Sequence, residues 1–138
     1  WRLARWQGHR TWREPLLLVL HVGYAWLAVG LGLIALAALT PAVAQTAALH
    51  ALTAGAMGVM PAAVMTRATL GHTGRALTAG AGSAVLFALL TLAAALRVAA
   101  PMGGGWYLDL LGASALAWIA GFGLFVALYG PMLVRPRR

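Results

Sequence analysis

The sequence predicts an all-α fold: a polytopic membrane bundle of four transmembrane helices with both termini in the cytoplasm. Three observations support this prediction. The 138 residues are 62% hydrophobic and 9% charged, with a mean hydropathy of +0.86, whereas a soluble domain commonly has about a quarter charged residues. The apolar residues form long blocks separated by short polar joints. The ten basic residues, all arginines, gather at the ends of these blocks, which is typical of membrane topology.

Four blocks are long enough to cross a bilayer, whose core of about 30 Å needs roughly 20 helical residues. They run from Pro15 to Leu39, Ala44 to Thr66, Thr78 to Ala100 and Trp106 to Gly130. Pro15 suits a first helical turn, where its missing N–H costs nothing, while Pro41 and Pro101 mark helix ends. Residues 1–14, rich in Trp and Arg, are predicted to be a cytoplasmic interfacial segment. Residues 135–138 are predicted to be a cytoplasmic basic tail.

The orientation follows from the arginines. With a cytoplasmic N-terminus, nine of the ten lie inside and Arg97 lies outside, as the positive-inside rule requires. Glycines occur in all four blocks, and small residues let transmembrane helices approach closely. The chain begins with Trp1 rather than Met, so we expect a fragment of a longer polytopic protein, with further helices in the same or a partner chain.

Composition and motifs exclude several classes of function. A net charge of +8 is compatible with nucleic-acid binding. The arginines, however, flank the apolar blocks and do not lie along one face of a soluble fold, so we predict no nucleic-acid partner. Without cysteine there is no disulfide framework and no thiolate metal site. The sequence has no P-loop, no G-x-S-x-G, no paired carboxylates and no metalloprotease motif. It therefore lacks the catalytic motifs of hydrolytic enzymes. Whether the protein is an enzyme is left open.

His21 and His50 are candidate ligands because an ionisable side chain at membrane depth is costly and commonly functional. His21 lies about 9 Å inside the cytoplasmic end of the first helix, and His50 lies near the outer end of the second. Roughly 10 to 15 Å of depth separates them, which is too far for one ion held at about 2 Å by each imidazole. The alternative for each is a histidine hydrogen-bonded between helices.

Met57 and Met60 follow His50 at i+7 and i+10. Thioether and imidazole ligands together suit copper, but His50 and Met57 are about 10 Å apart along the helix axis. The alternative interpretation is that the methionines fill space between helices. Pro61 is expected to kink this helix and free a carbonyl near Met57.

His72 lies in the joint between the second and third helices, after Gly71, where we expect a left-handed helix cap. This joint lies on the same side as His21, so the two imidazoles could form one centre near the inner face, with His72 held by a loop. The alternative is a solvated turn residue, with Arg67 and Arg75 acting only as topology charges.

Two further patterns have both structural and functional interpretations. Aromatic residues repeat along one face of the fourth helix and could line a porphyrin or contact lipid or another helix; they are Trp118, Phe122, Phe125 and Tyr129. Arg97 and Asp109 both lie near the outer interface, where an ion pair would offset the cost of partial burial.

Three motifs in order resemble the C-terminal part of the NnrS family: "REPLLLVLHVGYAWLAVGLGLIALA" (13–37), "ALHALTAGAMG" (48–58) and "VMTRATLGHTGR" (64–75). The resemblance implies a multi-pass protein of the bacterial inner (cytoplasmic) membrane that contains haem b and copper and takes part in the nitric oxide response, protection from nitrosative stress and denitrification. His21, His50 and His72 fall on the family's histidine motifs, which makes each a candidate ligand. Pro61 departs from the expected pattern.

The leading hypothesis is therefore a haem- and copper-binding membrane protein, with nitric oxide as a ligand and the lipid bilayer as its surroundings. His21 and His72 would form a cytoplasmic-side centre, and His50, with Met57 and Met60 as further candidates, a separate one. The alternative is a proton-coupled or anion transporter or channel module without a metal centre. In it, the histidines and Arg97 would relay protons or bind an anion near the midplane. A third possibility is a subunit that contributes only helix packing.

Overall fold

The computed structural model describes Thr11 and residues 14–134, and in this part of the chain the fold is entirely helical. Four helical stretches are long and apolar enough to cross a membrane: Pro15–Leu39, Gln45–His72, Ala81–Met102 and Gly104–Val134. This confirms the predicted all-α bundle with four spans. The predicted tail 135–138, and all of the predicted interfacial segment 1–14 except Thr11 and Glu14, lie outside the described residues.

The first span is the uninterrupted helix α2 (Pro15–Leu39). The second consists of α3 (Gln45–His50), the π-helix η2 (Ala51–Met57) and α4 (Gly58–His72). The third is α5 (Ala81–Ala99) with a 3₁₀ turn, η3 (Ala100–Met102). The fourth begins with a 3₁₀ turn, η4 (Gly104–Trp106), and continues as α6 (Tyr107–Val134).

The prolines act at helix starts as expected but do not always end a helix. Pro15 occupies the first turn of α2, and the chain becomes extended at Thr40, just before Pro41. Pro131 lies inside α6, which runs to Val134 rather than ending at Gly130. A proline this close to a helix end removes only one intrahelical hydrogen bond, so α6 can continue past it for one more turn.

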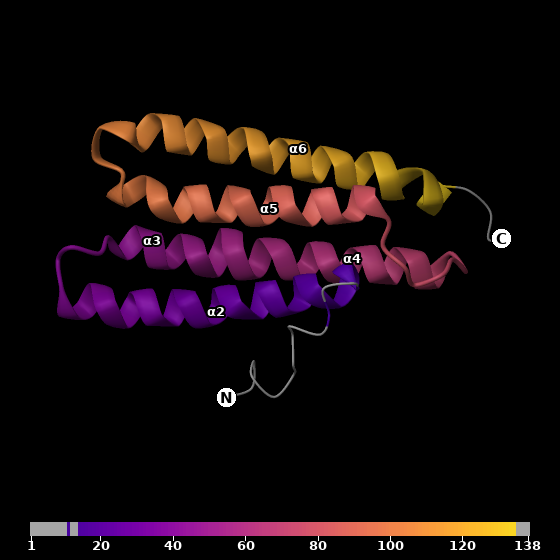
Figure 1. Cartoon of the computed structure of the whole chain (residues 1–138), viewed down its shortest axis with the longest axis horizontal. Coiled ribbons are helices and arrows are strands. Elements are labelled where there is room, and N and C mark those ends of the chain that lie inside the picture. Colours follow the sequence, from indigo (N-terminus) through magenta and orange to yellow (C-terminus); the bar gives the residue numbers. More distant parts are fainter. Residues whose placement is uncertain (1–10, 12–13, 135–138) are drawn as a thin grey trace.

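The spans lie side by side in chain order and alternate in direction, with α2 and α6 outermost (Figure 1). The buried core lies at the centre of the bundle, where its largest fully buried side chains are Leu86, Leu90, Val59 and Thr66. A hydrogen bond of 2.5 Å between the hydroxyls of Ser83 and Tyr129 joins α5 to α6 inside this core. Ser114 of α6 also donates a hydrogen bond to the carbonyl of Ala93 on α5, at 2.8 Å.

Glycines set the distance between neighbouring helices. A Cβ on Gly55 would lie 2.6 Å from the Trp26 ring, and a Cβ on Gly58 would lie 2.5 Å from the Trp118 ring. Each indole therefore lies directly against the backbone of the second span. The predicted close approach of helices through small residues is confirmed at these positions.

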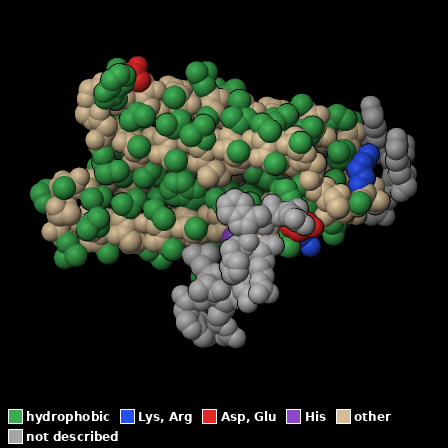
Figure 2. All heavy atoms as spheres, in the orientation of Figure 1, with side chains coloured by type: hydrophobic (Ala, Val, Ile, Leu, Met, Phe, Trp, Pro, Cys, Tyr) green, Lys and Arg blue, Asp and Glu red, His purple; other side chains and the backbone are tan. Residues whose placement is uncertain are grey.

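The outer surface is apolar over most of its length. On the face seen in Figure 2, hydrophobic side chains extend along the bundle, and the visible acidic and basic side chains lie toward its ends. Exposed large hydrophobic residues occur on every span, among them Leu31, Val64, Leu92 and Ile119. Exposing such a surface to water would be energetically unfavourable, whereas lipid chains can cover it without this free-energy cost.

Candidate functional site

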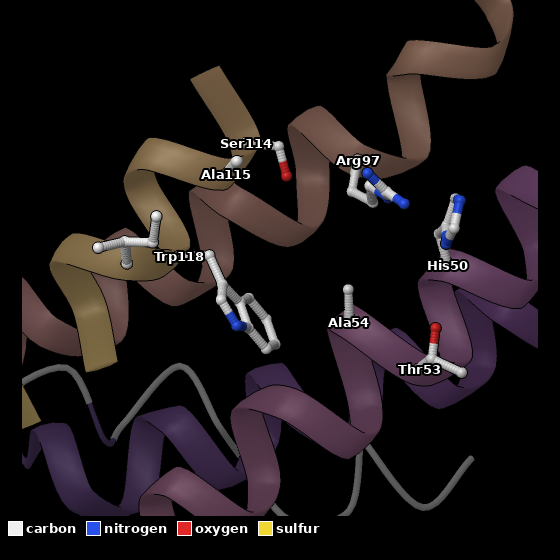
Figure 3. A pocket seen from close by; sticks show the side chains of 8 residues that line it. His50, Thr53, Ala54, Arg97, Ser114, Ala115 and Trp118 are labelled. Carbon is white, nitrogen blue, oxygen red and sulfur yellow. The ribbon is translucent and has the colours of Figure 1, made fainter. Parts of the chain in front are cut away.

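A cavity of about 550 Å³ lies between the second, third and fourth spans and forms the candidate functional site. His50 and Arg97 lie close together at one end of it and Trp118 lies toward the other (Figure 3). The polar part of its wall is formed by His50, Thr53, Arg97 and Ser114. The apolar part is formed by Ala54, Ala115, Trp118 and Ile119. The cavity is therefore polar at one end and apolar at the other.

An irregular backbone positions His50. It is the last residue of α3, and the π-helix η2 begins immediately after it. A π-turn contains one residue more than an α-turn, and such turns occur frequently at functional sites. The π-helix ends at Met57, four residues before Pro61, and proline cannot bond the carbonyl at i−4. A π-helix thus precedes Pro61, while the kink and the freed carbonyl expected there stay predictions.

Arg97 lies in the last turn of α5 and is half-buried against the cavity. A cation at a helix C-terminus is favoured by the helix dipole. The ion pair expected with Asp109 does not form: both residues belong to the described part of the chain, but Asp109 is exposed in the first turn of α6. Arg97 instead lines the cavity, together with His50.

A second, smaller cavity of about 100 Å³ shares His50 and Arg97 with the first. Thr46 at the start of α3 and Tyr107 at the start of α6 also line it. Thr46 and Tyr107 lie near the starts of α3 and α6, at the same end of the bundle. The smaller cavity therefore lies between this end and the two residues His50 and Arg97. His50 and Arg97 are therefore shared by a small cavity of mixed lining and a larger, mostly apolar one.

His21 is half-buried on α2, remote from this cavity. Its Nδ1 donates a hydrogen bond to the carbonyl of Leu17, one turn earlier, at 2.8 Å. Because Nδ1 carries the proton in this bond, Nε2 is the ring nitrogen with the lone pair in the neutral imidazole. Such a bond to one nitrogen commonly orients a metal-binding histidine.

His72 is an exposed residue at the end of α4, not part of a loop. The helix passes through Gly71, and in the turn that follows it is Gly74 that has a positive φ, of 73°. The N–H of Arg75 donates to the carbonyl of Leu70 at 2.9 Å, a hydrogen bond typical of a Schellman cap. The predicted cap at Gly71 and the predicted loop position of His72 are therefore wrong.

The register of α2 against the second span separates the histidines. Gly23 faces Met60, and Gly30 faces Leu52. His21 is thus level with the residues around Ala62, so His72 lies about 15 Å further along the axis. By the same register, His50 lies about 18 Å from His21 in the opposite direction. The described fold does not bring two of these three imidazoles to one ion.

The family comparison points to one family. The chain matches the NnrS protein family over residues 1–137. It belongs to the NnrS family. No curated protein and no solved structure matches it. With four spans of sufficient length and an apolar surface, this NnrS chain is a multi-pass membrane protein.

The two methionines predicted as candidate ligands, Met57 and Met60, do not line the His50 cavity of the NnrS chain. Met57 is 70% exposed, and the side chain of Met60 packs against Gly23 of α2. Among residues 11 and 14–134, no group of three or more His, Cys, Asp or Glu side chains is close enough to hold a metal ion. A metal centre that includes one of these histidines would therefore need further ligands other than a cluster of described His, Cys, Asp or Glu side chains.

The aromatic face of α6 contacts other helices of the NnrS bundle. The ring centroids of Trp118 and Phe122 are 4.9 Å apart, and those of Phe125 and Tyr129 are 5.3 Å apart. Trp118 packs over Gly58, and Tyr129 is buried. Of the interpretations left open by the sequence, this arrangement supports helix contact.

The shared position of His50 and Arg97 in one cavity wall was not predicted, although the sequence contains a signal for it. His50 lies a few residues after the start of the second span, and Arg97 lies a few residues before the end of the third. Two antiparallel helices bring such positions to the same depth. Arg97 was instead expected to pair with Asp109, and the transporter alternative grouped it with the histidines without placing it beside His50.

Proposed function

We propose that this chain is part of an NnrS protein that binds haem b and copper in the bacterial inner membrane and acts in the nitric oxide response, with protection from nitrosative stress as its role. The observation that carries the proposal is the family match over residues 1–137. Family membership indicates a membrane protein of the nitric oxide response. The metals and their ligands are the further step proposed here.

The donor chemistry of the chain is compatible with both metals. Neutral imidazole binds haem iron and copper, and His21, His50 and His72 supply three imidazoles in separate places. His21 has its Nδ1 proton directed to a carbonyl, which prepares Nε2 for coordination. His50 borders a cavity large enough to admit a bulky group. Each histidine would supply one ligand, and helices outside the described residues would complete the centre.

A ferrous haem or cuprous ion would supply an open coordination position for nitric oxide. The residues of this chain would bind and orient the metal through imidazole nitrogens. The surrounding apolar helices would exclude water from the site. Nitric oxide is small and uncharged, so it reaches a site inside the bilayer without a polar entrance.

The test uses the protein purified at its natural length in detergent. We expect haem absorbance that shifts on anaerobic addition of nitric oxide, and copper in elemental analysis. His21→Ala, His50→Ala and His72→Ala are compared with Gln45→Ala, an exposed change near His50. Loss of most of the haem or copper signal in at least one histidine variant, but not in Gln45→Ala, would identify a ligand.

Two results would contradict the proposal. The first is wild-type protein without haem absorbance and without copper. The second is unchanged metal content in all three histidine variants. Ion flux in liposomes that depends on His50 and persists after metal removal would instead support the transporter alternative.

A further inference from the structure

Arg97 is a half-buried cation of the membrane-spanning region that lines the cavity. The residues that line its cavity include no carboxylate. Two hydroxyls in the wall already donate to backbone: Ser114 to Ala93 at 2.8 Å, and Thr53 to Leu49 at 2.7 Å. Charged groups at membrane depth pair with one another, with backbone carbonyls or with water. The cavity thus presents a positive end to whatever occupies it.

The depth of Arg97 matches that of lipid head groups. It lies five residues before Met102, where the third span ends, which corresponds to about 8 Å along a helix axis. Trp106 and Tyr107, at the same end of the bundle, are both exposed. Exposed Trp and Tyr mark the interface between the hydrocarbon core and water. Arg97 therefore lies just inside this interface.

The rest of the cavity suits a hydrocarbon chain. Beyond the polar end, its wall is formed by Ala54, Ala115, Trp118 and Ile119. Ile119 is 68% exposed on α6, so the cavity opens sideways toward the bilayer. A volume of about 550 Å³ is on the order of 18 times the share of one water molecule in the liquid. A small inorganic ion would leave most of it unfilled.

We propose that the cavity bordered by Arg97 and His50 binds an anionic phospholipid from the leaflet at that end of the bundle. The guanidinium contacts the phosphate, as in basic pockets between transmembrane helices. One acyl chain lies along Ile119 and Trp118. The smaller cavity beside Tyr107 accommodates the polar part of the head group. This site shares its cavity and His50 with the proposed metal function, so a lipid and a metal-bound group at His50 are alternative occupants.

The test is native mass spectrometry of the natural-length protein with phosphatidylglycerol and with phosphatidylcholine of identical acyl chains. We expect the wild type to retain phosphatidylglycerol preferentially. Arg97→Gln is expected to weaken this retention about five-fold, while Arg97→Lys, which keeps the charge, retains most of it. Arg67→Gln removes an exposed arginine of α4 outside this cavity and is the matched control.

A second variant tests the acyl-chain part of the site with Arg97 intact. Ala115 is exposed and lines the cavity, so Ala115→Phe fills the space without disturbing the buried core. We expect it to lower phosphatidylglycerol retention as well. Size-exclusion profiles of all variants show whether they remain folded.

Three results would overturn the lipid site. Equal retention of both lipids by the wild type would show that the charge of the lipid is not recognised. Equal loss in Arg97→Gln and Arg67→Gln would show only general attraction to cations. Unchanged lipid retention in Arg97→Gln, together with lost haem absorbance or lost binding of a small anion such as nitrite, would assign the cavity to that occupant. Absence of haem and copper from the wild type, by contrast, contradicts only the proposed function.

Discussion

Gly121 and Gly123 are two residues apart on α6 but have opposite surroundings. A Cβ on Gly121 would lie 2.7 Å from Cδ2 and 3.0 Å from Cγ of Leu90, whereas a Cβ on Gly123 would meet nothing within 4 Å. Leu90 is fully buried in the core, so it has little room to move. The absence of a side chain at Gly121 is therefore a condition for the close packing of α5 and α6.

This contrast predicts different effects of the same substitution. Gly121→Ala is expected to destabilise the bundle by about 1–3 kcal/mol, because it overpacks the contact with Leu90. Gly123→Ala is expected to be neutral or to stabilise by about 0.5–1 kcal/mol, because alanine loses less backbone entropy than glycine in a helix. Unfolding of both variants by denaturant in detergent micelles measures the difference. Equal effects of the two changes would show that Leu90 does not limit the packing distance.

At the scale of elements, long apolar blocks and Pro15 were sufficient to predict where the spans lie, because hydrocarbon thickness fixes helix length. Helix ends were harder to predict. "LGHTGR" has two glycines, and only the hydrogen bond from Arg75 to Leu70 shows that Gly74 is the cap. Hydropathy does not predict where α4 ends, because the helix can extend beyond the hydrocarbon core into the polar region.

The candidate site was only partly predictable, for a related reason. His50 stood out because an ionisable residue in an apolar block is rare. The sequence indicates that Arg97, on another helix, lies at a similar depth, but only the packing of the second and third spans shows that both residues line one cavity. The π-helix η2 also changes which residues share a face after His50, so i+7 spacing did not place Met57 beside it. Met57 is exposed, away from the cavity.

The π-helix leads to a prediction about deletions. A π-turn has one residue more than an α-turn, so removing Thr53, an exposed residue of η2, lets the segment become α-helical while both flanks keep their faces. We expect a loss of stability below about 1 kcal/mol. Removing Ala88, an exposed residue of α5, instead rotates the following helix by about 100° and turns Leu90 out of the core.

The Ala88 deletion is therefore expected to cost more than about 4 kcal/mol or to prevent folding. Protein yield and denaturant unfolding in detergent measure both deletions. If the loss of Thr53 were as damaging as the loss of Ala88, η2 would be a fixed requirement of the fold rather than an accommodated extra residue.

At the scale of the whole molecule, the inner and outer spans have different surroundings. In an apolar 18-residue window of each span, 44% of the residues are buried in the second and third spans but only 11% in the first and fourth. The exposed apolar faces of α2 and α6 are thus available to lipid or to the helices of a partner. The predicted metal ligands His21, His50 and His72 lie at different depths in the bundle. Such surroundings fit this arrangement, because the metal centre at each histidine would be completed by ligands from outside these four spans.

Orientation in the membrane is the remaining prediction at this scale, and the absence of cysteine makes it directly testable. Nine of ten arginines lie on one side if both termini are cytoplasmic, and translocating them would oppose the positive-inside bias. Ala42 and Ala76 are exposed residues of the first and second joints, at opposite ends of the bundle. Single cysteines at these positions therefore report on opposite sides of the membrane.

We expect a membrane-impermeant maleimide to label Ala42→Cys in intact spheroplasts, and to label Ala76→Cys only after the membrane is permeabilised. The cysteine-free parent is the background control. The reverse pattern would place Arg97 and the His50 cavity on the cytoplasmic side and would overturn the assignment of the arginines as topology charges. Labelling of both positions in intact cells would mean mixed orientation, which a nine-to-one distribution of arginines should prevent.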